Sequence, residues 1–345
     1  MGVTRRDVAK LAGVSTATVS NVFNSKGEFY SEETRRRVLD VANQLNYHPN
    51  MVARSLIKSE TMQLSLLIND IHNQFFVDII HYFEMAAMKK GYMVSVCTGQ
   101  DDFDKYVSNF IARRLDGLFL MISPTRCKPE KIYEMVDCSI KIVVSGNLCL
   151  DPAKVSSLEP DCYCCMDRAL RYLRSFGHQR IAYLSAFEDS YPNDERLPAF
   201  RKVYREIFPE DQKVIMTGRY PYPSDRATGY ELTSRLMESG QPVTAILTTN
   251  DLMAMGCMEA LQKRGIRIPE DISVMGIDDD RPIVEYTRPR LTTISFNKRE
   301  FAERAFGLLY AQLQGEEPRQ EQVYHDIVER DSVGPAARQP IVFAD

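Results

Sequence analysis

Two groups of side chains in this sequence have the chemistry to recognise another molecule. The first occupies residues 16–21, where small or hydrogen-bonding side chains share the face of a predicted helix that carries no acid. Such a face can enter the major groove of DNA and meet base edges without repelling phosphates. Three short amphipathic helices could equally form a helical bundle with no role in DNA binding. The residues of this face are Thr16, Ala17, Thr18, Ser20 and Asn21.

The second group follows the apolar runs in the rest of the sequence. Amides, acids, an arginine and aromatic rings stand there, and this combination is typical of a polar small-molecule site. Ligands of open parallel sheets bind beyond the carboxyl ends of the strands, so these positions are candidates for such a site. They comprise residues 69–76, Ser145-Gly146-Asn147, residues 190–196, Tyr220, Asn250-Asp251 and Asp278-Asp279-Asp280.

The first group lies among helix start and stop signals. Thr4, with Asp7 three residues later, predicts a variant of the capping box. Gly13 can end that helix in a left-handed conformation, and Ser15 and Ser31 can cap two more. Two short helices joined by a turn that contains glycine are what a helix-turn-helix requires. The predicted core of this small bundle is Val8, Leu11, Ala12, Val19, Val22, Val38, Leu39, Ala42 and Leu45.

The second group lies in an alternation of strand and helix patterns. Because the strand-like stretches are almost continuously apolar, they predict parallel sheets covered by helices on both faces. The fold class is therefore α/β, with two doubly wound lobes. Predicted strands are 64–68, 93–97, 118–122, 140–145, 181–185, 214–217, 245–249 and 273–277, and predicted helices include 77–90, 161–176, 226–239 and 252–264.

Charge and composition agree with a protein that touches a polyanion at one end. Residues 1–60 contain nine Lys/Arg and six Asp/Glu, a balance of +3, so the rest of a chain of net charge −4 carries −7. No apolar run is long enough for a membrane span, and charges near the N-terminus argue against a secretory signal. We therefore expect a cytoplasmic protein, no membrane partner, and eight reduced cysteines.

Residues 8–24 and 45–56 resemble two motifs of the lactose/galactose repressor (LacI/GalR) family. The first run is VAKLAGVSTATVSNVFN, which is similar to the family headpiece, and the second contains LNYHPN and VARSL, which resemble its hinge. The resemblance implies that Thr16, Ala17 and Asn21 face bases and that Leu56 wedges into the minor groove, where it would otherwise be an ordinary amphipathic residue. The implied DNA-binding set is Thr4, Ser15, Thr16, Ala17, Thr18, Ser20, Asn21, Asn24, Tyr47, Asn50, Arg54 and Leu56.

The rest of the chain resembles the periplasmic-binding-protein-like (type 1) sensor of the same family. The resemblance rests on runs such as PVTA at 242–245, NDLMAMG at 250–256 and DISVMGIDD at 271–279. The effector-binding residues that it implies are Phe75, Phe76, Arg196, Tyr220, Asn250 and Asp278. Without the resemblance, the phenylalanines could be core, Asp251 could cap the helix beginning at Leu252, and Arg196 could pair with a neighbouring acid.

One departure from that family bears on the ligand. Many sugar-binding members place an acid after the strand that ends here at Val144-Ser145, where this chain has Ser145-Gly146-Asn147. The stretch 188–195 is also rich in acids. We therefore expect a carbohydrate effector other than a simple hexose, such as a larger glycoside, or a ligand with a cationic group.

The expected organisation follows from these assignments. A headpiece spans 1–49, a hinge helix and linker 50–60, and a two-lobed domain 61–333, followed by a flexible tail at 334–345. Lobe 1 is expected to comprise 61–160 and 291–322, and lobe 2 161–290 and 323–333. Pro335 and Pro340 forbid a leucine-heptad helix at the end, so the family resemblance implies a homodimer, and not a tetramer, on a palindromic operator.

Other functions are less well supported. Cys162, Cys164 and Cys165 have no second pair at zinc-ligand spacing, and no catalytic motif occurs, so we expect no metal, no cofactor and no enzyme activity. The leading hypothesis is a transcriptional regulator, most simply a repressor, controlled by a small effector. The alternatives are a DNA-binding regulator controlled by a partner protein, and a sugar-active enzyme or transport-type binding protein with a helical head.

Overall fold

The chain divides into a small N-terminal unit and a larger second unit. The computed structural model separates into two units, Met1–Met62 and Gln63–Asp345. It describes residues 3–23, 29–48, 60–98, 102–122, 127–146, 148–187, 195–208, 214–218 and 224–338. The predicted hinge helix lies outside the described residues.

The described residues of the first unit form three helices with the expected caps. They are α1 (Arg5–Ala12), α2 (Thr16–Phe23) and α3 (Glu32–Gln44). The backbone N–H and hydroxyl of Thr4 donate to the Asp7 carboxylate at 2.8 and 2.6 Å. Ser15 Oγ accepts from the Thr18 N–H at 3.0 Å, and Gly13 has φ of 64°. These contacts satisfy N–H groups that a helix start otherwise leaves without partners.

The core of this unit differs from prediction at one position. Val8 and Ala12 are buried as expected, but Leu11 is 54% exposed and Ala9 is buried in its place. On a helix of 3.6 residues per turn, Val8, Ala12 and Ala9 form one continuous stripe, and Leu11 projects from its far side. The apolar spacing alone therefore chose the wrong third residue.

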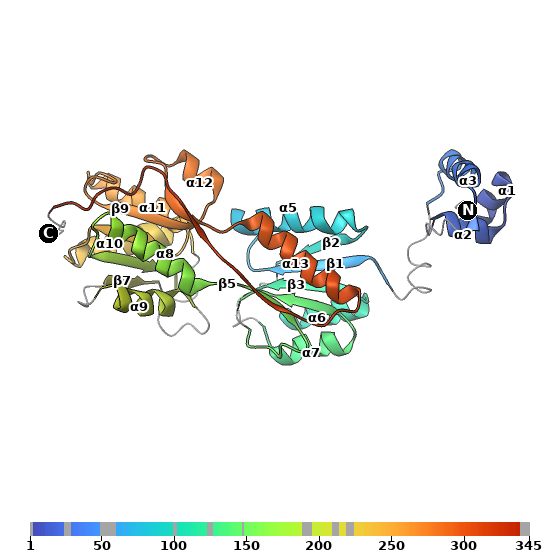
Figure 1. Cartoon of the computed structure of the whole chain (residues 1–345), viewed down its shortest axis with the longest axis horizontal. Helices are drawn as coiled ribbons and strands as arrows, with labels where there is room; N and C mark the ends of the chain where they lie inside the picture. The colour runs from blue at the N-terminus through green and yellow to red at the C-terminus, as the bar shows by residue number, and fades with distance from the viewer. Residues whose placement is uncertain are drawn as a thin grey trace. The chain divides into compact units, whose positions relative to one another are not determined.

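The second unit holds two six-stranded sheets, which confirms the two-lobed α/β fold (Figure 1). Sheet A, in lobe 1, has the order β11-β5-β4-β3-β1-β2, and sheet B, in lobe 2, has β12-β10-β9-β8-β6-β7. All pairings are parallel except that of β10 with β12. The strands of sheet A are β1 (Gln63–Ile68), β2 (Met93–Cys97), β3 (Gly117–Met121), β4 (Lys141–Val144), β5 (Ser156–Pro160) and β11 (Gln320–Val323). Those of sheet B are β6 (Ile181–Ser185), β7 (Val214–Thr217), β8 (Ala245–Thr248), β9 (Ser273–Asp278), β10 (Thr292–Ser295) and β12 (Asp326–Val328).

Helices cover both sheets. Those of lobe 1 are α5 (Gln74–Lys89), α6 (Phe103–Ala112), α7 (Pro129–Asp137) and α13 (Lys298–Leu313). Those of lobe 2 are α8 (Cys162–Ser175), α9 (Arg196–Ile207), α10 (Arg226–Glu238), α11 (Asp251–Lys263) and α12 (Arg281–Tyr286). The central strands are buried on both faces, and Leu64, Leu66 and Leu118 are fully inaccessible.

The chain crosses between the lobes three times. It leaves sheet A after β5 and returns after β10, and β11 and β12 complete one sheet each. The return was expected at residue 291, but Thr292–Ser295 pairs with β9 in sheet B, and Val323 pairs with Pro160 in sheet A. Local pattern gives no information about which distant strand a short run will join, so the observed crossings lie a few residues away from the expected ones.

The start of the expected flexible tail is attached to lobe 2. Ser273 and His178 hydrogen-bond the Gly334 backbone, with His178 Nε2 3.0 Å from its carbonyl oxygen. The Ala336 N–H donates to the Phe176 carbonyl at 2.8 Å. The flexible-tail prediction is therefore wrong for residues 334–336, and residues 339–345 lie outside the described part.

Candidate functional site

The predicted DNA-contacting residues of α2 lie at or near the surface of the first unit. Ser15, Thr16 and Ala17 are exposed, and Thr18, Ser20 and Asn21 are half-buried. Among the described residues, this helix carries no acid, while Arg5, Arg6 and Lys10 are exposed on α1. The helix thus presents small polar groups beside a cationic neighbour, which suits a groove lined with phosphates.

Other predicted DNA contacts either interact within the first unit or lie outside the described residues. The Thr18 hydroxyl is 2.9 Å from Ser15 Oγ, and the Thr4 hydroxyl donates a hydrogen bond to the Asp7 carboxylate. Tyr47 packs its ring edge-on against Phe23, with centroids 5.7 Å apart. Asn24, Asn50, Arg54 and Leu56 lie outside the described part of the chain.

The side chain of Asn250, a predicted effector contact, forms hydrogen bonds within the protein. Its Oδ1 accepts from the Met253 N–H at 2.9 Å, which caps α11, and its Nδ2 donates to the Ser224 carbonyl at 2.8 Å. Only 4% of the residue is exposed. The capping role that the sequence suggested for Asp251 therefore belongs to Asn250, because α11 begins at Asp251 and not at Leu252.

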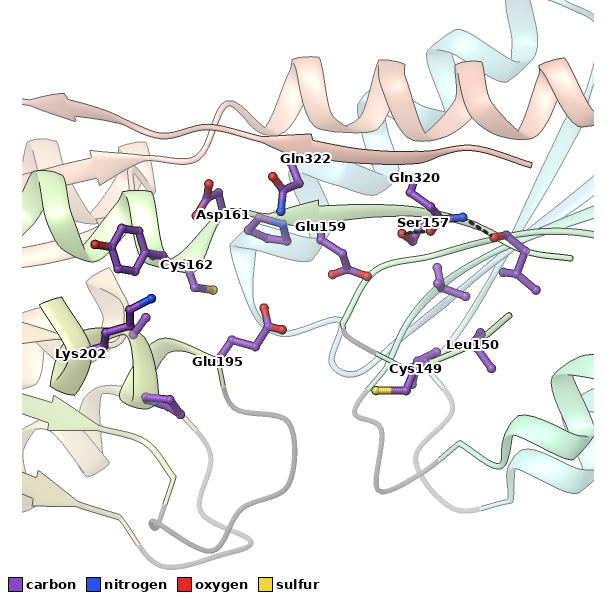
Figure 2. A pocket seen from close by; sticks show the side chains of 17 residues that line it. Cys149, Leu150, Ser157, Glu159, Asp161, Cys162, Glu195, Lys202, Gln320 and Gln322 are labelled. Carbon is purple, nitrogen blue, oxygen red and sulfur yellow. Dashed lines mark hydrogen bonds between the residues drawn. The ribbon is translucent and has the colours of Figure 1, made fainter. Parts of the chain in front are cut away.

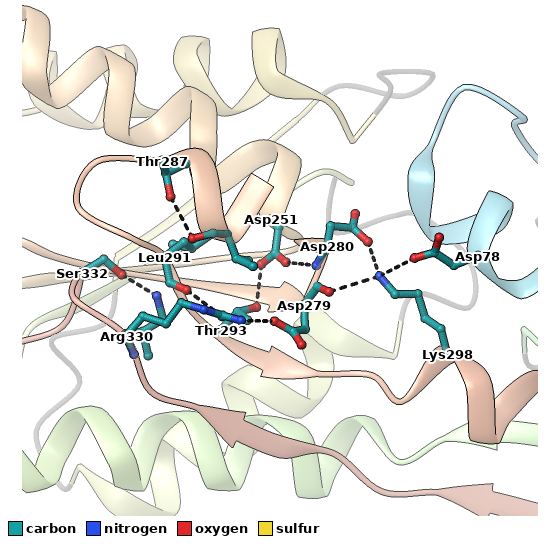
Figure 3. A network of polar contacts seen from close by, with 12 residues as sticks. Asp78, Asp251, Asp279, Asp280, Thr287, Leu291, Thr293, Lys298, Arg330 and Ser332 are labelled. Atoms are coloured by element: carbon teal, nitrogen blue, oxygen red, sulfur yellow. Dashed lines mark hydrogen bonds and ion pairs between the residues drawn. The ribbon is translucent and has the colours of Figure 1, made fainter. Parts of the chain in front are cut away.

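Asp251 forms the centre of a buried polar network (Figure 3). Its Oδ2 accepts from the Asp280 N–H at 2.8 Å, and its Oδ1 accepts from the Thr293 hydroxyl at 2.6 Å. Burial, reinforced by the Asp278 carboxylate, raises the pKa of Asp251 well above its ordinary value. The network ties α11, β10 and the segment after β9 together behind the strand ends.

The structure brings Arg196 and Asp278 close together. Arg196 begins α9, and its Nη1 donates to the Thr249 carbonyl at 3.0 Å. Asp278 ends β9 with φ of 114° and is 5% exposed. Burial raises the pKa of Asp278, and the charge of Arg196 opposes that rise. Asp278 thus lies at the end of β9, and Arg196, which follows β6 in the sequence, lies near the end of β8.

The predicted aromatic pair packs at the junction of the lobes. The Phe75 ring lies 5.3 Å from Phe76 and 5.1 Å from Phe296, which follows β10. Both predicted rings are half-buried. Tyr220, the remaining predicted contact, lies outside the described residues.

A pocket of about 790 Å³ opens between the two lobes (Figure 2). Glu159, at the end of β5, contributes a carboxylate from lobe 1, and Glu195, before α9, contributes one from lobe 2. The other described lining residues include Cys149, Ser157, Asp161, Cys162, Tyr163, Lys202, Gln320 and Gln322. Arg196, Asp278, Asn250, Phe75 and Phe76 are not in this described lining.

Glu159 is the residue that the sequence reasoning missed. Its Oε2 accepts from the Gly146 N–H at 2.8 Å. A carboxylate of the neighbouring strand β5 thus lies beside the residues that follow β4. The only available signal was an acid in the polar run SSLEP at 156–160, which the analysis did not assign to a strand.

The described residues contain no cluster of three His, Cys, Asp or Glu side chains arranged to hold a metal ion. Within the same part of the chain, no helix is both long and apolar enough to cross a bilayer.

Comparison with known proteins places these features in one family. Residues 4–50 match the family described as bacterial regulatory proteins, lacI family, and residues 170–333 match the periplasmic binding protein-like domain. The HTH-type transcriptional repressor PurR of Vibrio atlanticus (strain LGP32) is 33% identical over 341 residues, covering 96% of this chain and 98% of that protein.

Solved structures show the same fold. The Lac repressor bound to ONPG in the repressed state superposes with a TM-score of 0.81 at 25% identity, covering 96% of this chain and all of that one. A complex of the transcriptional regulator CelR with cellobiose superposes with a TM-score of 0.68 at 23% identity, covering 96% and 99%.

Proposed function

Because the chain belongs to the LacI family of bacterial regulatory proteins, and is a DNA-binding transcriptional repressor controlled by a small molecule, we propose that its effector occupies the pocket between Glu159 and Glu195. The observation that carries this proposal is the pocket itself, whose walls come from both lobes. A ligand that touches both walls binds one arrangement of the lobes better than another, and only such a ligand can shift their equilibrium.

The lining indicates the chemistry of the effector. Glu159 and Glu195 are hydrogen-bond acceptors, and Gln320 and Gln322 offer both donors and acceptors. A volume of about 790 Å³ lies within the general range of small-molecule ligand sites. We propose a glycoside or an amine-bearing sugar, and the cellobiose complex of CelR is a precedent within the fold.

We propose that Arg196 and Asp278, which do not line this pocket, affect effector binding by positioning the residues that do. Arg196 follows Glu195 directly, and its bond to the Thr249 carbonyl fixes the start of α9. We therefore expect Arg196→Ala to weaken the effector response while leaving operator affinity without effector nearly unchanged.

The first unit is proposed to read one half of a palindromic operator as part of a homodimer. Its reading helix is α2, and the Lac repressor crystallised as a dimer on operator is a precedent for that assembly. We propose that Thr16 and Ala17, which are exposed, and Asn21, which is half-buried, face the bases.

Calorimetry of the full chain against neutral glycosides and amine-bearing sugars tests the effector site. For a sugar that binds, Glu159→Gln should weaken binding about tenfold or more, because it removes the charge yet keeps an acceptor for the Gly146 N–H. Glu130→Gln, on an exposed position of α7, is the matched control. Equal affinity in the wild type and Glu159→Gln would remove Glu159 from the site. Operator binding without any sugar binding would favour control by a partner protein.

A further inference from the structure

The ammonium group of Lys298 contacts both lobes (Figure 3). Lys298 opens α13 in lobe 1, and its Nζ pairs with the Asp280 carboxylate of lobe 2. The same Nζ lies 3.3 Å from the Asp279 carbonyl oxygen, also in lobe 2, and 3.4 Å from Asp78 Oδ2 on α5. The pair with Asp280 crosses between the lobes, whereas the pairs Arg168–Asp326, Arg304–Glu321 and Arg330–Asp279 each lie within one lobe.

The bridge is buried, unlike most ion pairs of this chain. The Lys298 and Asp280 side chains are only 8% and 2% exposed. Burial alone would lower the pKa of Lys298, but the Asp280, Asp278 and Asp78 carboxylates together raise it above its ordinary value, so the group stays charged. A buried charge that loses its partner is strongly disfavoured. Moving the lobes apart here would leave Asp280 without its cation, while Lys298 would keep Asp78.

The bridge and the pocket lie on different sides of the strands that join the lobes. In Figure 1, α5 and α12, which carry or adjoin Asp78 and Asp280, lie above β5, whereas α9, which lines the pocket, lies below it. Two stiff lobes joined through such strands move by a change of angle, as in hinge closure. A ligand that changes the spacing of the pocket walls must therefore also change the spacing across the bridge.

We propose that the Lys298–Asp280 ion pair is a latch that fixes the angle between the lobes, and that loss of this latch weakens operator binding. The second clause rests on the proposed function, and the first does not. Because the latch opposes any change of angle, the effector must supply enough differential binding to overcome it.

Hydrogen–deuterium exchange of the full chain without ligand tests the latch. Lys298→Met and Asp280→Asn should speed exchange by about tenfold or more in residues 158–162 and 294–298 and in the first turn of α9. The interior strands β3 and β8 should exchange as in the wild type. Asp78→Asn removes the contact inside lobe 1 only, and Arg299→Met breaks an exposed pair with Glu303 on the same helix. Both controls should match the wild type.

Two results would overturn the latch. One is wild-type exchange at the crossings in Lys298→Met, and the other is an equal increase in β3 and β8, which would mean a general loss of stability. If Lys298→Met does not fold, Asp280→Asn replaces it, since that variant keeps the ammonium and its contact with Asp78.

Operator binding tests the second clause. On DNA selected by the wild-type chain, Lys298→Met should bind at least about fivefold more weakly than Arg299→Met. The reason is that lobes at a variable angle no longer hold the two headpieces of the dimer at a fixed spacing. Equal affinity of the two variants, with altered exchange, would keep the latch but refute its role in DNA binding. Failure of the wild type to select DNA would instead refute the proposed function, and the exchange result would stand by itself.

Discussion

The polar residues of α2 and those that follow β8 and β9 differ in their exposure and in their hydrogen bonds, although both groups were chosen from the sequence for the same reason. Thr16, Ala17 and Asn21 are at or near the surface of the first unit. Asn250 and Asp251 instead use their side chains to cap α11 and to hold β10 and the segment after β9. A polar residue on a short surface helix is available to a partner, whereas one beside a buried sheet end is often needed by the fold itself.

The sharpest contrast is at Asp251. Asp251→Ala leaves the Asp280 N–H and the Thr293 hydroxyl without a buried acceptor, so we expect a loss of about 2 to 4 kcal/mol in unfolding free energy. Urea denaturation measures this loss, with Glu285→Ala, an exposed position of α12, as the control. A loss no larger than that of the control would mean that the network is dispensable.

The buried histidines make the second unit sensitive to acid. Burial lowers the pKa of His178 to about 4, because it disfavours the imidazolium. The unfolded chain therefore takes up the proton first, and the stabilising effect, full above pH 6.5, is lost as the pH falls toward 4. We expect His178 to account for a decrease on the order of 3 kcal/mol over that window.

Unfolding free energies between pH 7 and pH 4 check this prediction. His178→Gln should reduce the slope and leave the share of His325, whose pKa burial also lowers to about 4, and His81→Gln, on an exposed position of α5, should leave the profile unchanged. A profile that keeps its full slope in His178→Gln would assign the acid sensitivity to other groups.

Substitution of Asn21 should lower DNA affinity and not stability, whereas substitution of Asp251 should lower stability. Asn21→Ala is expected to cost about 1 to 3 kcal/mol on the selected operator and to relax one base position, with little change in unfolding free energy. Filter binding on specific and random DNA separates the two effects. An equal loss on both DNAs would place Asn21 on the phosphates.

Substitution of Asn250 is expected to give the smallest effect, and it distinguishes a helix cap from an effector contact. As a cap, Asn250→Ala should lose about 1 kcal/mol of stability, and Asn250→Ser, which still caps, should lose less. Thermal unfolding of the pair measures this difference. If instead Asn250→Ser binds effector as poorly as Asn250→Ala while both remain stable, Asn250 contacts the effector as the family resemblance implied.

These contrasts show what local sequence can and cannot predict. Caps at Thr4, Ser15 and Ser31 were predictable because each depends on residues within one turn. The apolar strands were also predictable, but β5, β10, β11 and β12 are short or polar and are defined by distant partners. Glu159 was missed for the same reason, since it reaches Gly146 only because β4 and β5 are neighbours.

The most direct test of the account is selection of bound DNA from a random pool by the full chain. We expect a palindrome whose affinity falls steeply with salt, because basic side chains release counterions from the phosphates. Asn21→Ala should alter one position in each half-site. Recovery of no enriched sequence, or of a sequence that Thr16, Ala17 and Asn21 substitutions leave unchanged, would contradict the assignment of α2 as the reading helix.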